Sequence, residues 1–124
     1  MKASQAMTLD VLLMLLRRWA FVTDNEDQLQ AQIAATMTEF DVAFEREFVL
    51  PGKAGRIDFL FGTLGLEIKV DGSFPAVAAQ VQRYAECECI SAVVLLTTKP
   101  AHRNLPQEIA GKPVRVVLMQ RGFA

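Results

Sequence analysis

The stretch "RIDFLFGTLGLEIKV", residues 56–70, has the alternation of two β-strands joined by a turn at residues 62–65. Apolar side chains recur at every second position, as expected when one face of a hairpin packs against a core. Three charged side chains interrupt this pattern: Asp58 in the first arm, and Glu67 and Lys69 in the second. Burying a charge is costly unless the charge is paired, so these three residues require a structural or chemical explanation.

Two explanations are open for the charged residues of the hairpin. Glu67 and Lys69 share one face of their strand, and Asp58 can lie beside them if the hairpin register allows. Two adjacent buried carboxylates repel each other, and a divalent cation between them would remove that repulsion. Oxygen ligands without His or Cys indicate Mg²⁺ or Mn²⁺. The alternative is a half-exposed sheet with an ordinary cross-strand Asp–Lys or Glu–Lys pair.

Length and composition indicate one domain, residues 1–124, that is long enough to form a core. The apolar share of 52% and the mean hydropathy of +0.23 indicate either an unusually complete core or an apolar surface that meets a partner. The net charge of −1 excludes a global basic field, so any contact with DNA must come from local clusters of Lys and Arg. We expect no zinc finger and no other sequence-reading element.

The two cysteines, Cys87 and Cys89, are separated by one residue. A disulfide between such close neighbours is strained, so we expect reduced thiols and a cytoplasmic protein. A structural zinc site is disfavoured because such sites need four ligands, and His102 is the only histidine.

The N-terminal stretch "LDVLLMLLRRWAF", residues 9–21, predicts a helix within residues 1–22. Its apolar run, residues 11–16, is far shorter than the roughly 20 residues that span a membrane, so we expect no membrane segment. Six consecutive apolar residues cover every side of a helix, which predicts that the helix is buried all round. We therefore expect a homo-oligomer formed through this helix, with packing inside one chain as the alternative.

A second helix is expected to begin at "TDNE", residues 23–26, which has the form of a capping box with Thr23 as N-cap. Its apolar side chains recur at helical spacing: Leu29, Ile33, Met37 and Phe40. Glu26 lies on the same side of the helix and can point at the sheet. It can equally well bond the backbone of Thr23, as in a capping box.

The remaining elements complete the order α-α-β-β-β-α-β-(α)-β. Beyond the hairpin they are a strand at 42–50, a helix opened by Pro75 and running to 86, a strand at 89–98, a helical turn at 105–110 and a strand at 113–119. A helix between the third and fourth strands predicts a parallel crossover. We therefore expect an α/β protein with a central mixed sheet flanked by helices on both faces.

The helix after the hairpin carries Gln80, Arg83 and Tyr84 on one face, opposite an apolar stripe. Taken alone, this pattern is typical of an amphipathic helix with a solvated polar face. Together with Asp58 and the triplet Glu67-Ile68-Lys69, however, the Gln80-x-x-x-Tyr84 pattern resembles the PD-(D/E)xK nuclease superfamily. The likeness is closest to RecB-like and lambda-exonuclease-like members and to small phage and archaeal resolvase-like members.

The resemblance covers residues 23–98 and implies a restriction-endonuclease-like αβββαβ core. The helix at 1–22 and the turn and strand at 99–124 lie outside it. One departure is that Ile57 stands where the family often has proline, which leaves the chemistry unchanged.

The resemblance also implies the ligands of a catalytic Mg²⁺ or Mn²⁺ ion. Asp58 and Glu67 would bind the metal together with the backbone carbonyl of Ile68. Lys69 would orient the attacking water and stabilise the charge that develops on the phosphate. Glu26 would act on the metal through water, as the acidic residue that the family often carries on its first core helix.

Gln80 and Tyr84 would support this site and the substrate phosphate, and Arg83 would contact the DNA backbone nearby. Basic residues in neighbouring loops could neutralise further phosphates: Lys53, Arg56, Lys99 and Arg103. The alternative for these basic residues is scattered solubilising charge.

The sequence therefore predicts a Mg²⁺-dependent nuclease that hydrolyses DNA phosphodiester bonds in repair, recombination or phage DNA processing. We expect its cleavage to be structure-selective or non-specific. One alternative is a catalytically silent nuclease-fold module that binds DNA or a partner protein. Another is an obligate oligomeric interaction protein.

Overall fold

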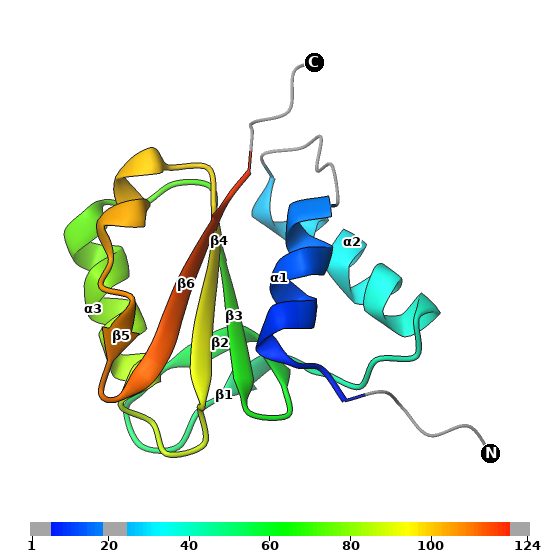
Figure 1. Cartoon of the computed structure of the whole chain (residues 1–124), viewed down its shortest axis with the longest axis horizontal. Helices are drawn as coiled ribbons and strands as arrows, with labels where there is room; N and C mark the ends of the chain where they lie inside the picture. Colours follow the sequence, from blue (N-terminus) through cyan, green and yellow to red (C-terminus); the bar gives the residue numbers. More distant parts are fainter. Residues whose placement is uncertain (1–5, 19–24, 120–124) are drawn as a thin grey trace.

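A computed structural model of the 124-residue chain describes residues 6–18 and 25–119 (Figure 1). In chain order the elements are α1 (Leu9–Arg18), α2 (Glu26–Glu39), β1 (Glu45–Val49), β2 (Arg56–Phe61), β3 (Leu64–Lys69), α3 (Phe74–Ala85), β4 (Ala92–Thr97), the 3₁₀ turn η1 (Pro100–Asn104), β5 (Glu108–Ile109) and β6 (Lys112–Leu118). None of the helices among these residues is long and apolar enough to cross a membrane.

The strands form one open sheet in the order β1-β2-β3-β4-β6-β5. β1 and β3 each pair antiparallel with β2, whereas β3, β4 and β6 run parallel and β5 is antiparallel to β6. Helix α3 connects β3 to β4, which confirms the predicted parallel crossover and the mixed sheet of an α/β protein. Because β3, β4 and β6 are parallel, their carboxyl ends lie at the same end of the sheet.

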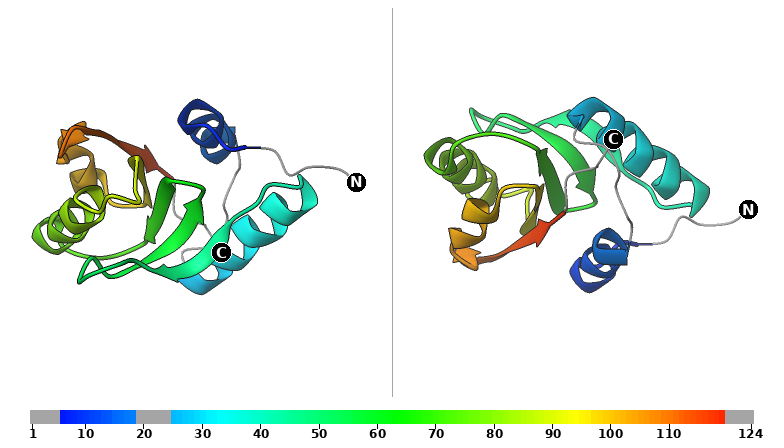
Figure 2. Two further views of the ribbon diagram at one scale, coloured as in Figure 1. Left: turned by 90° about the horizontal axis from the view of Figure 1, so that it is seen from below. Right: turned by 90° about the horizontal axis from the view of Figure 1, so that it is seen from above.

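Helices cover both faces of the sheet, as predicted (Figure 2). α1 and α2 pack on one face over Phe59, Leu66 and Val94, while α3 packs on the other over Val93 and Leu95. Every residue of β4 is buried, which is why its sequence is a continuous apolar run. The high apolar share of the chain is therefore largely explained by two complete core layers.

The start of α2 differs from the predicted capping box. Asn25 is the N-cap, and its side chain accepts a hydrogen bond from the backbone N–H of Gln28 at 3.0 Å. Glu26 is consequently the first helical residue and not the third residue after the cap; Thr23 lies outside the described residues. The stripe prediction is also wrong at Phe40, which is 55% exposed because the helix ends at Glu39. The other three stripe residues are fully buried.

Within one chain the first helix is not buried all round, so its burial on every side through a second copy stays a prediction. α1 rests on the outer side of the sheet, so only one of its faces meets the core, with Leu12, Leu13 and Leu16 buried. Val11 and Met14 lie outside this buried face and are 39% and 47% exposed. The N- and C-terminal parts of the predicted helix lie outside the described residues.

One turn is shorter than predicted, and another lies earlier in the chain than predicted. The β2–β3 hairpin turns at Gly62 and Thr63 alone, and Gly62 has a φ of 63° that suits glycine. The predicted helical turn at 105–110 is wrong because Glu108–Ile109 forms β5, and the helical turn η1 lies before it. β5 joins β6 through Ala110 and Gly111, both with positive φ, as a type I′ hairpin requires.

Candidate active site

β2 and β3 separate at the position of their charged residues. The backbone pairing of the hairpin extends to Phe59 and Leu66, and beyond them side chains take over the hydrogen bonds. The backbone N–H of Asp58 donates to Glu67 Oε1 at 3.2 Å, and the backbone N–H of Ile68 donates to Asp58 Oδ2 at 2.8 Å. Each carboxylate therefore binds the backbone of the opposite strand, which brings Asp58 and Glu67 together.

The strand on the other side of Asp58 is also irregular. In β1, Glu47 lies between two residues that pair with β2, at the position opposite Asp58, and has a φ of 52°. A left-handed conformation is strained for a residue with a side chain. Strain of this kind is concentrated at functional sites, where it fixes a local geometry that a regular strand would not provide.

Burial controls the protonation of the two carboxyl groups. Glu67 is only 4% exposed, and this burial, followed by the repulsion from Asp58, raises the pKa of Glu67 to about 7. The Nζ atom of Lys69 lies 3.4 Å from Glu67 Oε2 and opposes the rise. Burial also raises the pKa of Asp58, against the lowering effects of the Ile68 N–H and of Lys69. One ammonium thus faces the buried Glu67 and the half-buried Asp58, and an additional cation would favour the ionised forms of both acids.

The residues predicted on the third helix join this cluster. Tyr84 is fully buried in α3, so a solvated polar face is wrong for this residue. Its hydroxyl lies 2.7 Å from the Arg56 carbonyl and 3.2 Å from Glu67 Oε1, and it accepts a bond from Gln80 Nε2 at 2.8 Å. Burial, and next the charge of Glu67, raise the pKa of Tyr84 well above its usual value of 10. The phenol therefore keeps its proton and acts as a hydrogen-bond donor.

Helix α2 supplies a residue that the sequence did not reveal. Gln30 Nε2 donates to Asp58 Oδ1 at 2.9 Å, and Gln30 Oε1 accepts from Arg46 Nε at 3.1 Å. Glu26, one turn earlier, accepts from the backbone N–H of Val70 at 2.9 Å. The i, i+4 spacing of Glu26 and Gln30 was a signal that both side chains lie on the face that meets the sheet.

The structure thus connects Asp58, Glu67, Lys69, Gln80 and Tyr84 through one set of contacts. Glu26 is bound to the end of β3 and has no hydrogen bond to either carboxylate among the described residues.

The predicted DNA contacts are less closely tied to this cluster. Lys53, Arg56 and Arg83 are exposed, and only the backbone of Arg56 contacts a site residue. Lys99 is half-buried, and its Nζ atom lies 3.5 Å from Asp71 Oδ1.

The donor atoms are carboxylate oxygens, which fit Mg²⁺ or Mn²⁺ better than zinc or copper. Within the described ranges, no three His, Cys, Asp or Glu side chains are grouped closely enough to hold a metal by themselves. Mg²⁺, however, is usually held by one or two carboxylates and keeps several waters. Asp58 and Glu67 supply two such carboxylates, brought together by their bonds to opposite strands.

A second polar network borders the same end of the sheet and was not predicted. His102 is buried, with Nδ1 2.7 Å from Thr97 Oγ1 and Nε2 3.0 Å from the carbonyl of Gly72. Because a carbonyl only accepts, Nε2 carries a hydrogen, and in the neutral imidazole Nδ1 then accepts from the Thr97 hydroxyl. Thr97 pairs with Lys69 across the β3–β4 ladder, so this network stabilises the backbone next to the site.

Comparison of the chain with protein-family models, with curated proteins and with solved structures finds no match. The functional conclusion therefore depends on the geometry of the chain itself.

Proposed function

We propose that the chain is a metal-dependent nuclease with a restriction-endonuclease-like core that hydrolyses DNA phosphodiester bonds with Mg²⁺ or Mn²⁺. The observation that carries the proposal is the pair of carboxylates at the opening between β2 and β3, the half-buried Asp58 and the buried Glu67, with Lys69 Nζ 3.4 Å from Glu67 Oε2. The order α2-β1-β2-β3-α3-β4 supports the proposal because it matches the αβββαβ core that the sequence resembles.

In this proposal, Asp58, Glu67 and the carbonyl of Ile68 hold the metal. When bound, the metal supplies positive charge at the scissile phosphate. The ammonium of Lys69, whose side chain is 24% exposed, reaches solvent and the buried carboxylates at once. It orients the attacking water and stabilises the negative charge that develops on the phosphate.

The residues around the carboxylates position them. Tyr84 remains protonated, so it donates a hydrogen bond toward Glu67 and does not act as a base. Gln80 orients the Tyr84 hydroxyl, and Gln30 holds Asp58 from the opposite face of the sheet. We propose that cleavage is either selective for a DNA structure or non-specific. Either mode fits a role in repair, recombination or phage DNA processing.

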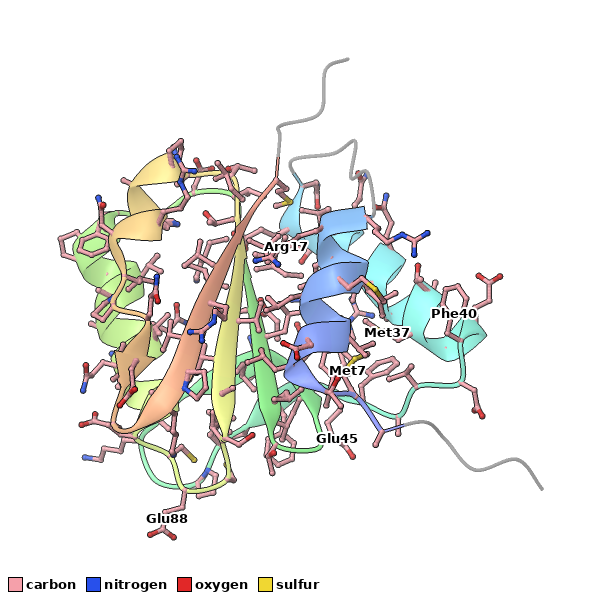
Figure 3. The ribbon with its side chains drawn as sticks, in the orientation of Figure 1. Met7, Arg17, Met37, Phe40, Glu45 and Glu88 are labelled. Atoms are coloured by element: carbon pink, nitrogen blue, oxygen red, sulfur yellow. The ribbon has the colours of Figure 1, made fainter. Side chains whose placement is uncertain are left out.

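The test is to incubate the protein with branched, linear duplex and single-stranded DNA in Mg²⁺ or Mn²⁺. We expect cleavage of at least one substrate, and at least a 100-fold loss in Glu67→Ala and Lys69→Ala, since such groups contribute about 10²–10⁴-fold. Glu88→Ala is the matched control because Glu88 is exposed at the opposite end of the sheet (Figure 3).

Absence of metal-dependent cleavage of all three substrates by the wild-type protein would overturn the nuclease proposal. If DNA binding then persists and is unchanged by both substitutions, the silent binding module becomes the better description.

A further inference from the structure

Three arginines from separate parts of the chain line one cavity at the β6 edge of the sheet. The cavity has a volume of about 300 Å³ and is bordered by Arg17 of α1, Arg103 of η1 and Arg115 of β6. The other described lining residues are Leu105, Gln107, Val114 and Val116, and none of the described lining residues is acidic. Figure 3 shows Arg17 reaching from α1 toward β6. Among the described residues, the cavity thus collects positive charge without a carboxylate in its lining.

The arginines differ in how firmly they are held. One terminal nitrogen of Arg115 donates to the carbonyls of Gln107 and Val114, at 2.9 and 3.0 Å, which fixes the guanidinium in place. In the part of the chain that the structure describes, no hydrogen bond or ion pair involves the side chains of Arg17 or Arg103. Most N–H donors of the three guanidinium groups therefore remain available to a ligand.

The chemistry of such a cavity selects an anion with several oxygens. A guanidinium matches phosphate by two parallel hydrogen bonds, which a lysine ammonium does not provide. The apolar side chains of Leu105, Val114 and Val116 add a wall against which a sugar can pack. A phosphate attached to a sugar therefore fits both the charge and the lining.

The register of the sheet relates this cavity to the buried carboxylates. Glu67 pairs with Leu95, and Leu95 pairs with Val116, so a cavity residue lies on the same row as Glu67 two strands away. At about 4.8 Å per strand, the backbones of Glu67 and Val116 are about 10 Å apart. That is about three base steps of a DNA duplex at about 3.4 Å each, so one nucleic acid can reach both places.

We infer that the cavity formed by Arg17, Arg103 and Arg115 binds a backbone phosphate of the nucleic acid outside the cleavage site. The inference rests on the proposed function for the identity of its ligand. It also answers the near-neutral net charge, because local arginines supply the electrostatic attraction that the whole chain lacks.

The test measures DNA binding in EDTA, so that cleavage does not enter. Anisotropy of a labelled duplex of about 20 base pairs is titrated with the full chain at several salt concentrations. We expect Arg17→Ala to weaken binding and to reduce the slope of log Kd against log salt by about 1, and Arg17→Ala/Arg103→Ala by about 2. Arg18→Ala is the matched control, since Arg18 is the next residue of the same helix and does not line the cavity.

The inference is overturned if Arg17→Ala and Arg18→Ala weaken binding equally, if neither has an effect, or if the wild-type chain does not bind the duplex. The variant Arg17→Lys/Arg103→Lys retains both charges. Its salt slope should lie closer to that of the wild type than the slope of Arg17→Ala/Arg103→Ala does, and its binding should be weaker than that of the wild type. An excess of inorganic phosphate that abolishes the arginine-dependent binding completely would instead indicate a site for free phosphate and overturn the nucleic-acid assignment. Loss of nuclease activity in every assay, with arginine-dependent binding intact, overturns the proposed function alone.

Discussion

The cost of burying Glu67 is visible in its ionisation. Its pKa is raised from 4.5 to about 7, so the protonated form favours folding. The corresponding stability is complete below pH 4.5 and is lost as the pH rises through 7. Without metal, Glu67→Gln should therefore be more stable than the wild type at pH 8, by on the order of 3 kcal/mol, and the advantage should shrink toward acid pH. Urea unfolding in EDTA at several pH values measures this difference.

The control for that experiment is Glu88→Gln, which neutralises an exposed carboxylate and should leave the pH dependence unchanged. Parallel stability curves for the wild type and Glu67→Gln across this pH range would show that Glu67 is not the group that titrates.

Gln30 gives a test of metal binding that does not depend on catalysis. Its amide holds Asp58, and residues that orient a ligand typically contribute 10–100-fold to metal affinity. For Gln30→Leu we expect the Mg²⁺ concentration that gives half of the maximal rise in unfolding temperature to increase by about 10–100-fold. Gln32→Leu, at an exposed position of the same helix, is the control. Equal Mg²⁺ dependence in the two variants would contradict a positioning role.

The sequence revealed the residues whose position follows from a period of two. Glu67 and Lys69 are two apart on one strand, and Asp58 meets them because the hairpin is short. Helical spacing places Gln30 on the same side of α2 as Glu26, but its contact with Asp58 and the complete burial of Tyr84 depend on how α2 and α3 approach the sheet. The site was therefore predictable along the strands and less so between the layers.

The elements show the same division. β4 was predictable because a parallel strand that is buried on both faces needs a continuous apolar run. The start of α2 was not, because "TDNE" offers Thr, Asp and Asn as possible caps, and Asn25 is the residue that caps. With that start, Glu26 is placed to bind the backbone N–H of Val70 at the end of β3. The bond between Glu26 and the end of β3 is therefore made in the helix that starts at the Asn25 cap.

His102 links three elements at the carboxyl end of the sheet. It lies in η1, bonds Thr97 at the end of β4, and bonds Gly72 in the connection to α3. His102→Ala removes the hydrogen bonds to the Thr97 hydroxyl and to the Gly72 carbonyl, at about 1 kcal/mol each, and should lower the unfolding temperature by roughly 10 °C. Thermal unfolding measures this, with Asn104→Ala, exposed in the same turn, as control. A change below about 2 °C for His102→Ala would show that water replaces the lost bonds.

At the scale of the whole molecule, the two edges of the sheet differ. β1 forms one edge and carries three consecutive charged residues, Glu45, Arg46 and Glu47, the last with a left-handed backbone. Charged and irregular edge strands resist pairing with another chain. The other side of the molecule has α1 packed beside β6, with Val11 and Met14 of α1 and Leu118 of β6 exposed. Self-association is therefore more compatible with α1 than with β1.

Homo-oligomer formation through α1 remains a prediction with a direct test. A standard interface covers about 800 Å² on each partner, about a ninth of the 7178 Å² surface of the chain. Val11 and Met14 are partly exposed and together cover only the centre of an interface of that size. We therefore expect association at micromolar concentration and not an obligate dimer. Met14→Glu should shift the sedimentation of the chain to that of a monomer with little change in unfolding temperature. Val49→Glu, which charges an exposed apolar residue of β1, should not. If Val49→Glu alone produces the monomer, the contact lies at the β1 edge. A wild-type chain that is monomeric at all concentrations would exclude both contacts.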